Sequence, residues 1–307
     1  MKRFIIIILI AVPFFGFSQF RLDYGANIGA AGYLGEIGGK AGRARPFIFD
    51  AKIGQTRWSL GGFARYKIMD DVFIRADLNY IRIQGADSLS SNPERFARNL
   101  SFRNDVFELL AKGEYTFYKV TDVGRTGRYA LSFATYVGAG AGIFYNNPRA
   151  NLNGTWHNLR ELQTEGNKYS AFQFAIPLSL GIHYTIKREH RIGFEISYRL
   201  TFTDYIDDAS TVYPDTTGMS PIAKVLSSRS EGIASEDGDE ESIYPHISNY
   251  QNGSPRGNPK GNDTYFTAMF SYSKVIKGKY KSKGLKGRGG LGAYKKRKKR
   301  RRTRAKF

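Results

Sequence analysis

The chain has 307 residues and a formal net charge of +20, with 47 Lys and Arg against 27 Asp and Glu. It contains no cysteine, which excludes a disulfide framework and a lipid-modified cysteine. Beyond the N-terminal apolar run, no segment supplies the roughly 20 consecutive apolar residues of a membrane helix, so a helical membrane protein is excluded as well.

The first 18 residues have the pattern of a secretory signal peptide. Lys2 and Arg3 precede an apolar run over residues 4–15, and the small residues Gly16 and Ser18 follow it. The run is too short to remain as a spanning helix. We therefore expect export and cleavage after Ser18.

Alternation of apolar and polar residues is the main structural signal after the leader. In residues 172–185 one face of an extended strand carries Phe172, Phe174, Ile176, Leu178, Leu180, Ile182 and Tyr184. The other face carries Gln173, Ala175, Pro177, Ser179, Gly181, His183 and Thr185. A period of two with one complete apolar face predicts a strand with lipid on its outer side and a polar interior on the other.

Eight such strands are predicted, near residues 20–34, 58–69, 72–83, 105–120, 130–145, 172–185, 191–206 and 264–276. The connections alternate between short turns and long segments, the long ones being residues 35–57, 84–104, 146–170 and 207–263. This asymmetry is typical of outer-membrane barrels. We therefore predict an all-β, antiparallel, up-and-down transmembrane barrel over residues 19–276, with both termini in the periplasm and the longest surface loop at about 207–263.

A barrel of about eight strands has an interior just wide enough for its own side chains. The predicted inward faces place charges of both signs in that space, at Arg65, Lys67, Arg75, Asp77, Glu108, Lys112, Glu114, Glu195 and Arg199. Because an unpaired buried charge costs several kcal/mol, we expect a paired network. The interior is therefore predicted to be filled, and the barrel is not expected to form a pore.

The segment 277–307 is predicted to be a basic periplasmic tail. From Lys274 to the C-terminus there are 17 Lys and Arg and no acidic residue, so the rest of the chain carries only +3. The densest run is Lys295, Lys296, Arg297, Lys298, Lys299, Arg300, Arg301 and Arg302. Such a block is disordered alone and attracts polyanions. Export excludes nucleic acid, which leaves anionic lipid, peptidoglycan or an acidic protein as partner, or a tail that is merely solvated.

No catalytic, cofactor or metal site is predicted. Ser179, His183 and Glu195 face inward on neighbouring strands, but the first two lie about 13 Å apart along their strand, beyond hydrogen-bonding reach. The acidic stretch within residues 236–241 lacks the spacing of a calcium loop, and the histidines show no spacing of metal ligands. The glycines at 287, 289 and 292 have the spacing of a dinucleotide-binding motif, but the sequence around them lacks the strand and helix pattern that such a motif requires.

Four short motifs occur in the loops and at strand ends. They are Tyr-Leu-Gly-Glu-Ile at 33–37, Arg-Asn-Leu-Ser-Phe-Arg at 98–103, Leu-Gln-Thr-Glu-Gly at 162–166 and Thr-Asp-Tyr-Ile-Asp-Asp at 203–208. Together, and in this order, they resemble the PorG-like outer-membrane barrels of Bacteroidetes, which are associated with the type IX secretion system. The resemblance extends over about residues 20–276.

The resemblance implies a non-catalytic subunit that anchors or organises periplasmic ring components of a secretion machine, with other secretion proteins and outer-membrane lipid as partners. Two alternatives remain open: a free-standing barrel similar to OmpA or OmpX that serves adhesion or envelope stability, and a lipid-directed hydrolase. Read without the family, Asp204, Asp207 and Asp208 lie where the seventh strand meets the surface and could either cap the chain there or pair with Arg98 or Arg103 in a loop cluster that Glu36 could join. Such a cluster could be a scaffold above the barrel mouth or a surface binding site.

Overall fold

The computed structural model describes residues 22–38, 53–125, 127, 130–235 and 243–276. The predicted signal peptide at 1–18, the acidic stretch within 236–241 and the basic tail at 277–307, including Lys295 to Arg302, lie outside the described residues. Among the described residues, no helix is long and apolar enough to cross a membrane.

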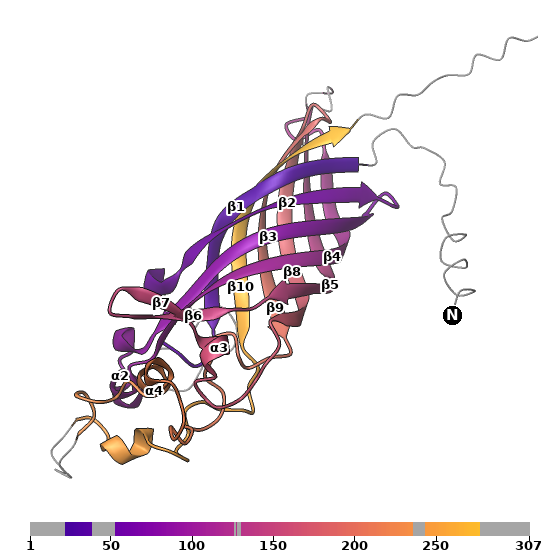
Figure 1. The fold of residues 1–307 in the computed structure, drawn as a ribbon. Helices are drawn as coiled ribbons and strands as arrows, with labels where there is room; N and C mark the ends of the chain where they lie inside the picture. Colours follow the sequence, from indigo (N-terminus) through magenta and orange to yellow (C-terminus); the bar gives the residue numbers. More distant parts are fainter. Residues whose placement is uncertain (1–21, 39–52, 126, 128–129, 236–242, 277–307) are drawn as a thin grey trace, which may run out of the picture.

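Eight long antiparallel strands form a closed barrel (Figure 1). They are β1 (Leu22–Leu34), β2 (Arg57–Lys67), β3 (Val72–Ala86), β4 (Ser101–Thr121), β5 (Leu131–Tyr145), β8 (Phe172–Ile186), β9 (His190–Thr201) and β10 (Thr264–Ile276). Each strand pairs with its neighbours along the chain, β1 pairs with β10, and the ring contains all eight. The predicted fold and strand number are therefore confirmed.

The outer surface of the barrel is apolar. Phe174, Leu78 and Phe270 remain 66%, 64% and 64% exposed, and the other outward positions of the same strands are mostly Leu, Ile, Val, Phe and Tyr. A continuous apolar surface of this extent is unfavourable in water but is the surface that lipid requires. The chain therefore forms a transmembrane β-barrel of the outer-membrane type.

Aromatic side chains contact one another across strands near both ends of this apolar surface. Towards one end Tyr80 packs between Trp58 and Phe107, with ring centroids 4.9 Å apart in each pair. Towards the other end Phe133 contacts Tyr184 at 4.9 Å. Such rings fit the two membrane interfaces, where an apolar body and a polar edge are both accommodated.

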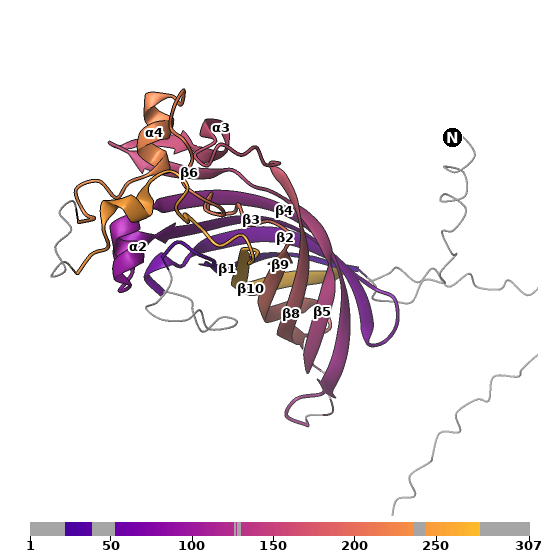
Figure 2. The same cartoon turned by 90° about the horizontal axis from the view of Figure 1, so that it is seen from below.

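The two ends of the barrel differ (Figures 1 and 2). At one end the strands are joined by short turns, and β1 begins beside the end of β10, with Leu22 opposite Ile276. At the other end the long connections gather over the opening. We call the described parts of these connections the loop cap: residues 35–38, 53–56, 87–100, 146–171, 202–235 and 243–263.

The loop cap has its own secondary structure. It contains three short α-helices, α2 (Pro93–Arg98), α3 (Leu159–Leu162) and α4 (Pro221–Ser227), and the 3₁₀ turns Ile53–Gln55, Asp87–Leu89 and Ile247–Tyr250. It also contains a hairpin of β6 (Pro148–Leu152) and β7 (Thr155–Asn158), attached to β4. Helix α2 begins where the Asn92 side chain accepts hydrogen bonds from two backbone amides, and it ends at Asn99 in the left-handed conformation.

Three boundaries differ from the sequence prediction. Strands β3 and β4 continue to the pair Ala86–Ser101, so their connection is shorter than the predicted 84–104. Strand β9 ends at Thr201, and the last long connection therefore begins at 202 and not at 207. Beyond Thr201 the chain is held beside the start of β10, where the Asp263 amide donates to the Thr203 carbonyl at 3.0 Å and the Asp263 side chain accepts from the Ile206 amide at 3.0 Å.

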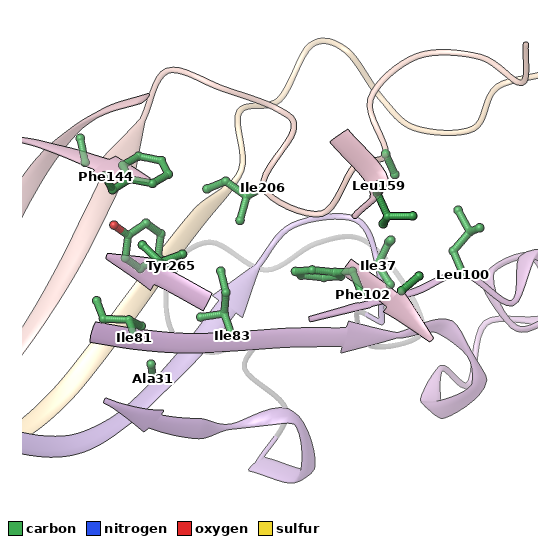
Figure 3. Packing of buried hydrophobic residues seen from close by; sticks show 14 of the residues in the cluster. Ala31, Ile37, Ile81, Ile83, Leu100, Phe102, Phe144, Leu159, Ile206 and Tyr265 are labelled. Carbon is green, nitrogen blue, oxygen red and sulfur yellow. The ribbon is translucent and has the colours of Figure 1, made fainter. Parts of the chain in front are cut away.

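The apolar core lies at the cap end of the barrel and continues into the cap (Figure 3). Ile81 and Ile83 of β3, Phe144 of β5 and Tyr265 of β10 point inward and are fully buried or nearly so. Ile206 enters the same cluster from the last long connection and has no exposed surface. The core therefore attaches the cap to the barrel.

Candidate functional site

The barrel interior carries ionisable side chains in the half nearer the short turns and around its middle. The eight predicted network residues, Arg65, Arg75, Asp77, Glu108, Lys112, Glu114, Glu195 and Arg199, all point inward and are at most 3% exposed. Lys67 differs, because its side chain lies at the turn end, 27% exposed, and pairs at 2.7 Å with the exposed Asp70. The structure thus brings eight of the nine predicted side chains together.

Arg75 lies at the centre of the network. Its guanidinium is 2.7 Å from Asp77, 3.3 Å from Glu114 and 3.0 Å from Glu195. The guanidinium also covers the ring of Phe63, with 4.0 Å from Cζ to the ring centroid. Because Arg presents five donors in one plane, it can bridge several carboxylates at once.

The remaining ion pairs continue from this centre towards both ends. Lys112 lies 2.7 Å from Glu195, and Arg199 lies 2.6 Å from Glu108. Towards the turns, Asp23 accepts from Arg65 at 2.8 Å and from Arg191 at 2.7 Å. The network therefore contains five cations and five carboxylates, Arg65, Arg75, Lys112, Arg191 and Arg199 with Asp23, Asp77, Glu108, Glu114 and Glu195.

Neutral donors complete the network. The Tyr136 hydroxyl donates to Glu195 at 2.8 Å and the Tyr265 hydroxyl donates to Glu108 at 2.9 Å. Gly181 on the next strand makes room for Tyr136, because a Cβ atom at Gly181 would lie 2.3 Å from the tyrosine ring. The interior is thus filled by paired side chains, as expected for eight strands.

Asp23, Arg191 and the two tyrosines were not among the predicted network residues. Asp23 shares the inward face of β1 with Asn27 and Ala31, and Arg191 is two residues before Gly193 and four before Glu195 on β9. The alternation of apolar and polar residues in these two strands could have assigned both side chains to the interior. Tyr265 could not be recognised in this way, because the inward side of β10 also carries Met269, an apolar residue.

The loop cap gathers a second set of ionisable groups over the barrel opening. Tyr33, at the end of β1, lies 2.5 Å from Asp207 and 2.7 Å from Asp263. A phenol has one proton, so one of these contacts needs a proton from a carboxyl group. Burial and the neighbouring Asp207 raise the pKa of Asp263 well above its usual range.

Four further cap carboxyls have raised pKa values, and burial is the largest cause for each. The pKa of Asp204 is raised to about 7, and that of Glu36 to about 8 with a contribution from Asp207 and Asp204. Asp207 and Asp208 have pKa values near 6, held down by the hydrogen bonds and cations around them. The cap therefore carries more buried carboxyl groups than its cations neutralise.

The arginines of the cap have partners other than those predicted. Arg98 binds Asp87 at 2.7 Å and donates to the backbone carbonyl of Arg256 at 2.7 Å. Arg103 lies over the ring of Trp156, at 3.8 Å, and its nearest carboxylate is Asp105 at 4.0 Å. The expected pairing of Arg98 or Arg103 with Asp204, Asp207 or Asp208 was therefore wrong: each arginine meets a carboxylate close to it in sequence.

Arg256 is the cation that contacts this aspartate cluster, and it was missed at the sequence level. It lies 2.9 Å from Glu165 and 3.8 Å from Asp208, and it donates to the Asp208 carbonyl. Glu165 in turn accepts from the backbone amides of Ser210 and Thr211 at 2.9 and 3.1 Å. A lone arginine in a long polar connection gives no periodic signal that would reveal these contacts.

A cavity of about 670 Å³, which we call the cap cavity, opens within the loop cap. Asp204, Asp263 and Tyr250 are buried in its wall, whereas Glu94, Asn258 and Asn262 are exposed at its rim. Both carboxylate oxygens of Asp204 and the Oε2 atom of Glu36 are buried and have no hydrogen-bond partner in the described part of the chain.

The three residues weighed as a hydrolytic set do not form one. Glu195 is occupied by Arg75, Lys112 and Tyr136. Ser179 Oγ and His183 Nδ1 are buried, and neither has a hydrogen-bond partner among the described residues. Ser179 fills the space beside Gly138, where a Cβ atom would lie 2.5 Å from its oxygen. Across the described ranges, no three His, Cys, Asp or Glu side chains are grouped to hold a metal ion.

Several solved barrels are similar to this chain. The N-terminal β-barrel domain of Pseudomonas aeruginosa OprF has 9% identity and a TM-score of 0.33, over 84% of this chain and 100% of that one. Neisserial surface protein A has 10% identity and a TM-score of 0.36, over 85% and 100%. Pseudomonas aeruginosa OprG has 10% identity and a TM-score of 0.35, over 84% and 98%. The fold assignment rests on the strand pairing of this chain, because these values are low.

A comparison with curated proteins found no match. A family model described as "Domain of unknown function (DUF6089)" matches residues 1–220, which include the first seven barrel strands and the beginning of the last long connection. Because this match covers more than half of the length of the chain, the chain belongs to the DUF6089 family.

Proposed function

We propose that this protein is a non-enzymatic barrel of the Gram-negative outer membrane that anchors or organises periplasmic components of a protein secretion machine of type IX. In this proposal the short turns and both termini face the periplasm, and the loop cap faces outward. Other secretion proteins and outer-membrane lipid are its partners, and it needs no cofactor.

The observation that supports a scaffolding role is the filled interior. Five cations and five carboxylates neutralise one another across the lumen, and the apolar core lies between them and the cap. Ions that entered this space would have to break several buried ion pairs at once, each of which costs several kcal/mol to separate. A barrel of this kind acts through its surfaces and not as a channel.

The secretion assignment rests on the four motifs shared with PorG-like barrels and on the basic tail. All four motifs meet in the loop cap, where Tyr33 contacts Asp207, Arg98 donates to the Glu36 carbonyl and the Thr164 hydroxyl donates to Asp208. Their convergence supports a shared cap architecture. The tail follows β10 at the turn end of the barrel, and its charge suits an acidic protein, peptidoglycan or anionic lipid.

The proposal is tested by affinity purification from detergent-solubilised outer membranes. The bait is the full chain, a chain truncated after Ile276, or a full-length chain in which the basic residues from Lys295 to Arg302 are all replaced by Gln. We expect periplasmic ring components to purify with the full chain and to be lost with the truncation. The Gln variant keeps the length of the tail and separates charge from chain length.

Recovery of all three baits without ring components would contradict the secretion assignment. The alternative, a free-standing barrel for adhesion or envelope stability, would then be the better account. The folded cap favours this alternative, because an ordered outer surface suits contact with an external partner. A lipid-directed hydrolase would instead show lipid or ester turnover that Ser179→Ala abolishes.

A further inference from the structure

The cap cavity combines a space of ligand size with carboxylates that have no counter-ion within the described ranges of the chain. Its volume of about 670 Å³ lies within the range of small-molecule sites. Asp204 is 8% exposed, and both of its carboxylate oxygens are buried without a hydrogen-bond partner among the described residues. Buried carboxylates are normally paired or hydrogen-bonded, so an unpartnered one in a cavity wall requires an explanation.

The cations of the cap do not supply that pairing. Arg98 is held by Asp87 and by two backbone carbonyls, and Arg256 is held by Glu165, Asp208 and the Ser227 carbonyl. In the described ranges, no Lys or Arg side chain lies within ion-pair distance of Asp204 or Glu36. The cavity therefore presents acceptors, three of them without donors among the described residues, and two of its lining arginines, Arg98 and Arg256, are already engaged. The third, Arg95, lines the cavity but forms no ion pair with Asp204 or Glu36 in the described ranges.

A metal ion fits this cavity less well than an organic cation. No three carboxylate or imidazole side chains of the described residues are disposed around one point, and the space is far larger than a bare ion needs. Apolar and aromatic groups stand beside the carboxylates, including Leu34, Pro245, Pro255 and Tyr198. Such walls suit the carbon chain of a ligand whose charged end reaches the acids.

We propose that the cap cavity binds a small organic cation through a primary ammonium or guanidinium group that pairs with Asp204 and Glu36. The raised pKa values of these carboxyls, about 7 and 8, agree with charges that lack partners. The nearby Ser210 hydroxyl lowers the pKa of Asp204, although it forms no hydrogen bond of ordinary geometry with either carboxylate oxygen. The Asn258 amide lowers the pKa of Glu36 by donating to Oε1, which leaves Oε2 without a partner, and Asp207 raises both pKa values. This site is separate from the proposed secretion role and can be tested whether or not that role holds.

The test measures binding to the full-length protein in detergent by isothermal titration calorimetry at pH 8. The probes are putrescine for the ammonium group and agmatine for the guanidinium group, with 1,4-butanediol as the neutral counterpart of putrescine and calcium chloride as the metal. We expect saturable binding of at least one amine, which identifies the preferred head group. We expect none for butanediol or calcium.

Two variants with a matched control locate the site. Asp204→Asn should weaken binding about tenfold or more, because a buried charge pair is lost. Asp215→Asn removes the same charge from an exposed position outside the cavity, in the same connection, and should leave binding unchanged. Asn262→Lys places a tethered ammonium at the exposed rim and should exclude the free amine without disturbing buried contacts.

Circular dichroism checks that each variant is folded. Equal binding of butanediol and putrescine, absence of binding by both amines, or equal weakening by the two aspartate variants would each overturn the proposal. Saturable calcium binding that Asp204→Asn removes, without amine binding, would replace the organic-cation site with a metal site and would also overturn it.

Discussion

Arg75 illustrates how single residues determine what the barrel interior can do. It is 2% exposed, and its guanidinium bridges carboxylates on three strands. A buried cation with three anionic partners cannot be removed without leaving net negative charge in a space that water reaches poorly. The interior network is therefore expected to be sensitive to substitution at its centre and tolerant of substitution at its ends.

Replacing Arg75 with Met should destabilise the barrel by about 3–5 kcal/mol, because Asp77, Glu114 and Glu195 lose a shared counter-ion. Urea unfolding in lipid vesicles measures the change. Lys67→Met is the matched control: its partner Asp70 is exposed, so the loss should stay below about 1 kcal/mol. Equal effects of the two substitutions would show that the interior pairs contribute no more than surface pairs.

At the residue scale the sequence predicted the inward charges well and the cap contacts poorly. Arg65 and Glu195 could be assigned to the interior because each lies in a strand with a clear alternation. In such a strand every second residue faces the same side of the sheet. Phe266 shows the limit of this rule, since its alternation with Phe270 and Tyr272 predicts a lipid-facing side chain, but it is 8% exposed and packs over Gly32 of the next strand. Arg256 shows a second limit, because the partners of its side chain lie up to 91 residues away in the sequence.

At the scale of elements, the barrel strands were predictable and the small elements of the cap were not. The hairpin β6–β7 was missed inside a presumed loop, although Asn153 and Gly154 form the tight turn that favours such hairpins. Its strands have only five and four residues, too few for the alternation to stand out. Turn chemistry, and not periodicity, was the available signal.

Gly154→Ala should loosen this hairpin by about 1 kcal/mol, because Gly154 has a φ of +86° that a side chain disfavours. Hydrogen exchange of the β6 and β7 amides should become faster while the barrel amides stay unchanged. Gly261→Ala is the control, since its Cβ would also meet open space but its backbone is not left-handed. If both variants exchange like the wild type, the turn conformation does not limit the hairpin.

The cap should be more stable at pH 5 than at pH 8. Glu36, Asp204, Asp207, Asp208 and Asp263 all have folded pKa values above the ordinary range near 4. The folded cap therefore binds more protons than the unfolded chain, and stability falls as pH rises from about 4 through the folded values near 6 to 8. The cations that face these carboxyls are Arg98 and Arg256.

Hydrogen exchange of the segments 203–210 and 255–263, corrected for the intrinsic effect of pH, measures this change. Protection should fall on the order of tenfold between pH 5 and pH 8, with no change in the barrel strands. Asp204→Asn should reduce the dependence. Equal protection at the two pH values would mean that protonation of these carboxyls does not stabilise the cap.

At the scale of the whole molecule, the separation of short turns from the loop cap gives the barrel a direction. The absence of cysteine makes this direction measurable with single introduced thiols. Asn252→Cys lies in the exposed cap and Asp71→Cys in an exposed turn at the opposite end. In intact cells an impermeant maleimide should label the first variant, and should label the second only after the outer membrane is permeabilised. The reverse pattern would invert the proposed orientation.

The distribution of the interior charges along the chain has a consequence for assembly. Strands β1 to β4 contribute three cations and four carboxylates, and β9, synthesised much later, contributes two cations and one carboxylate. The early strands alone retain an excess negative charge that only β9 neutralises. A partly formed sheet would therefore expose unmatched charge to lipid, which favours insertion as a nearly complete ring.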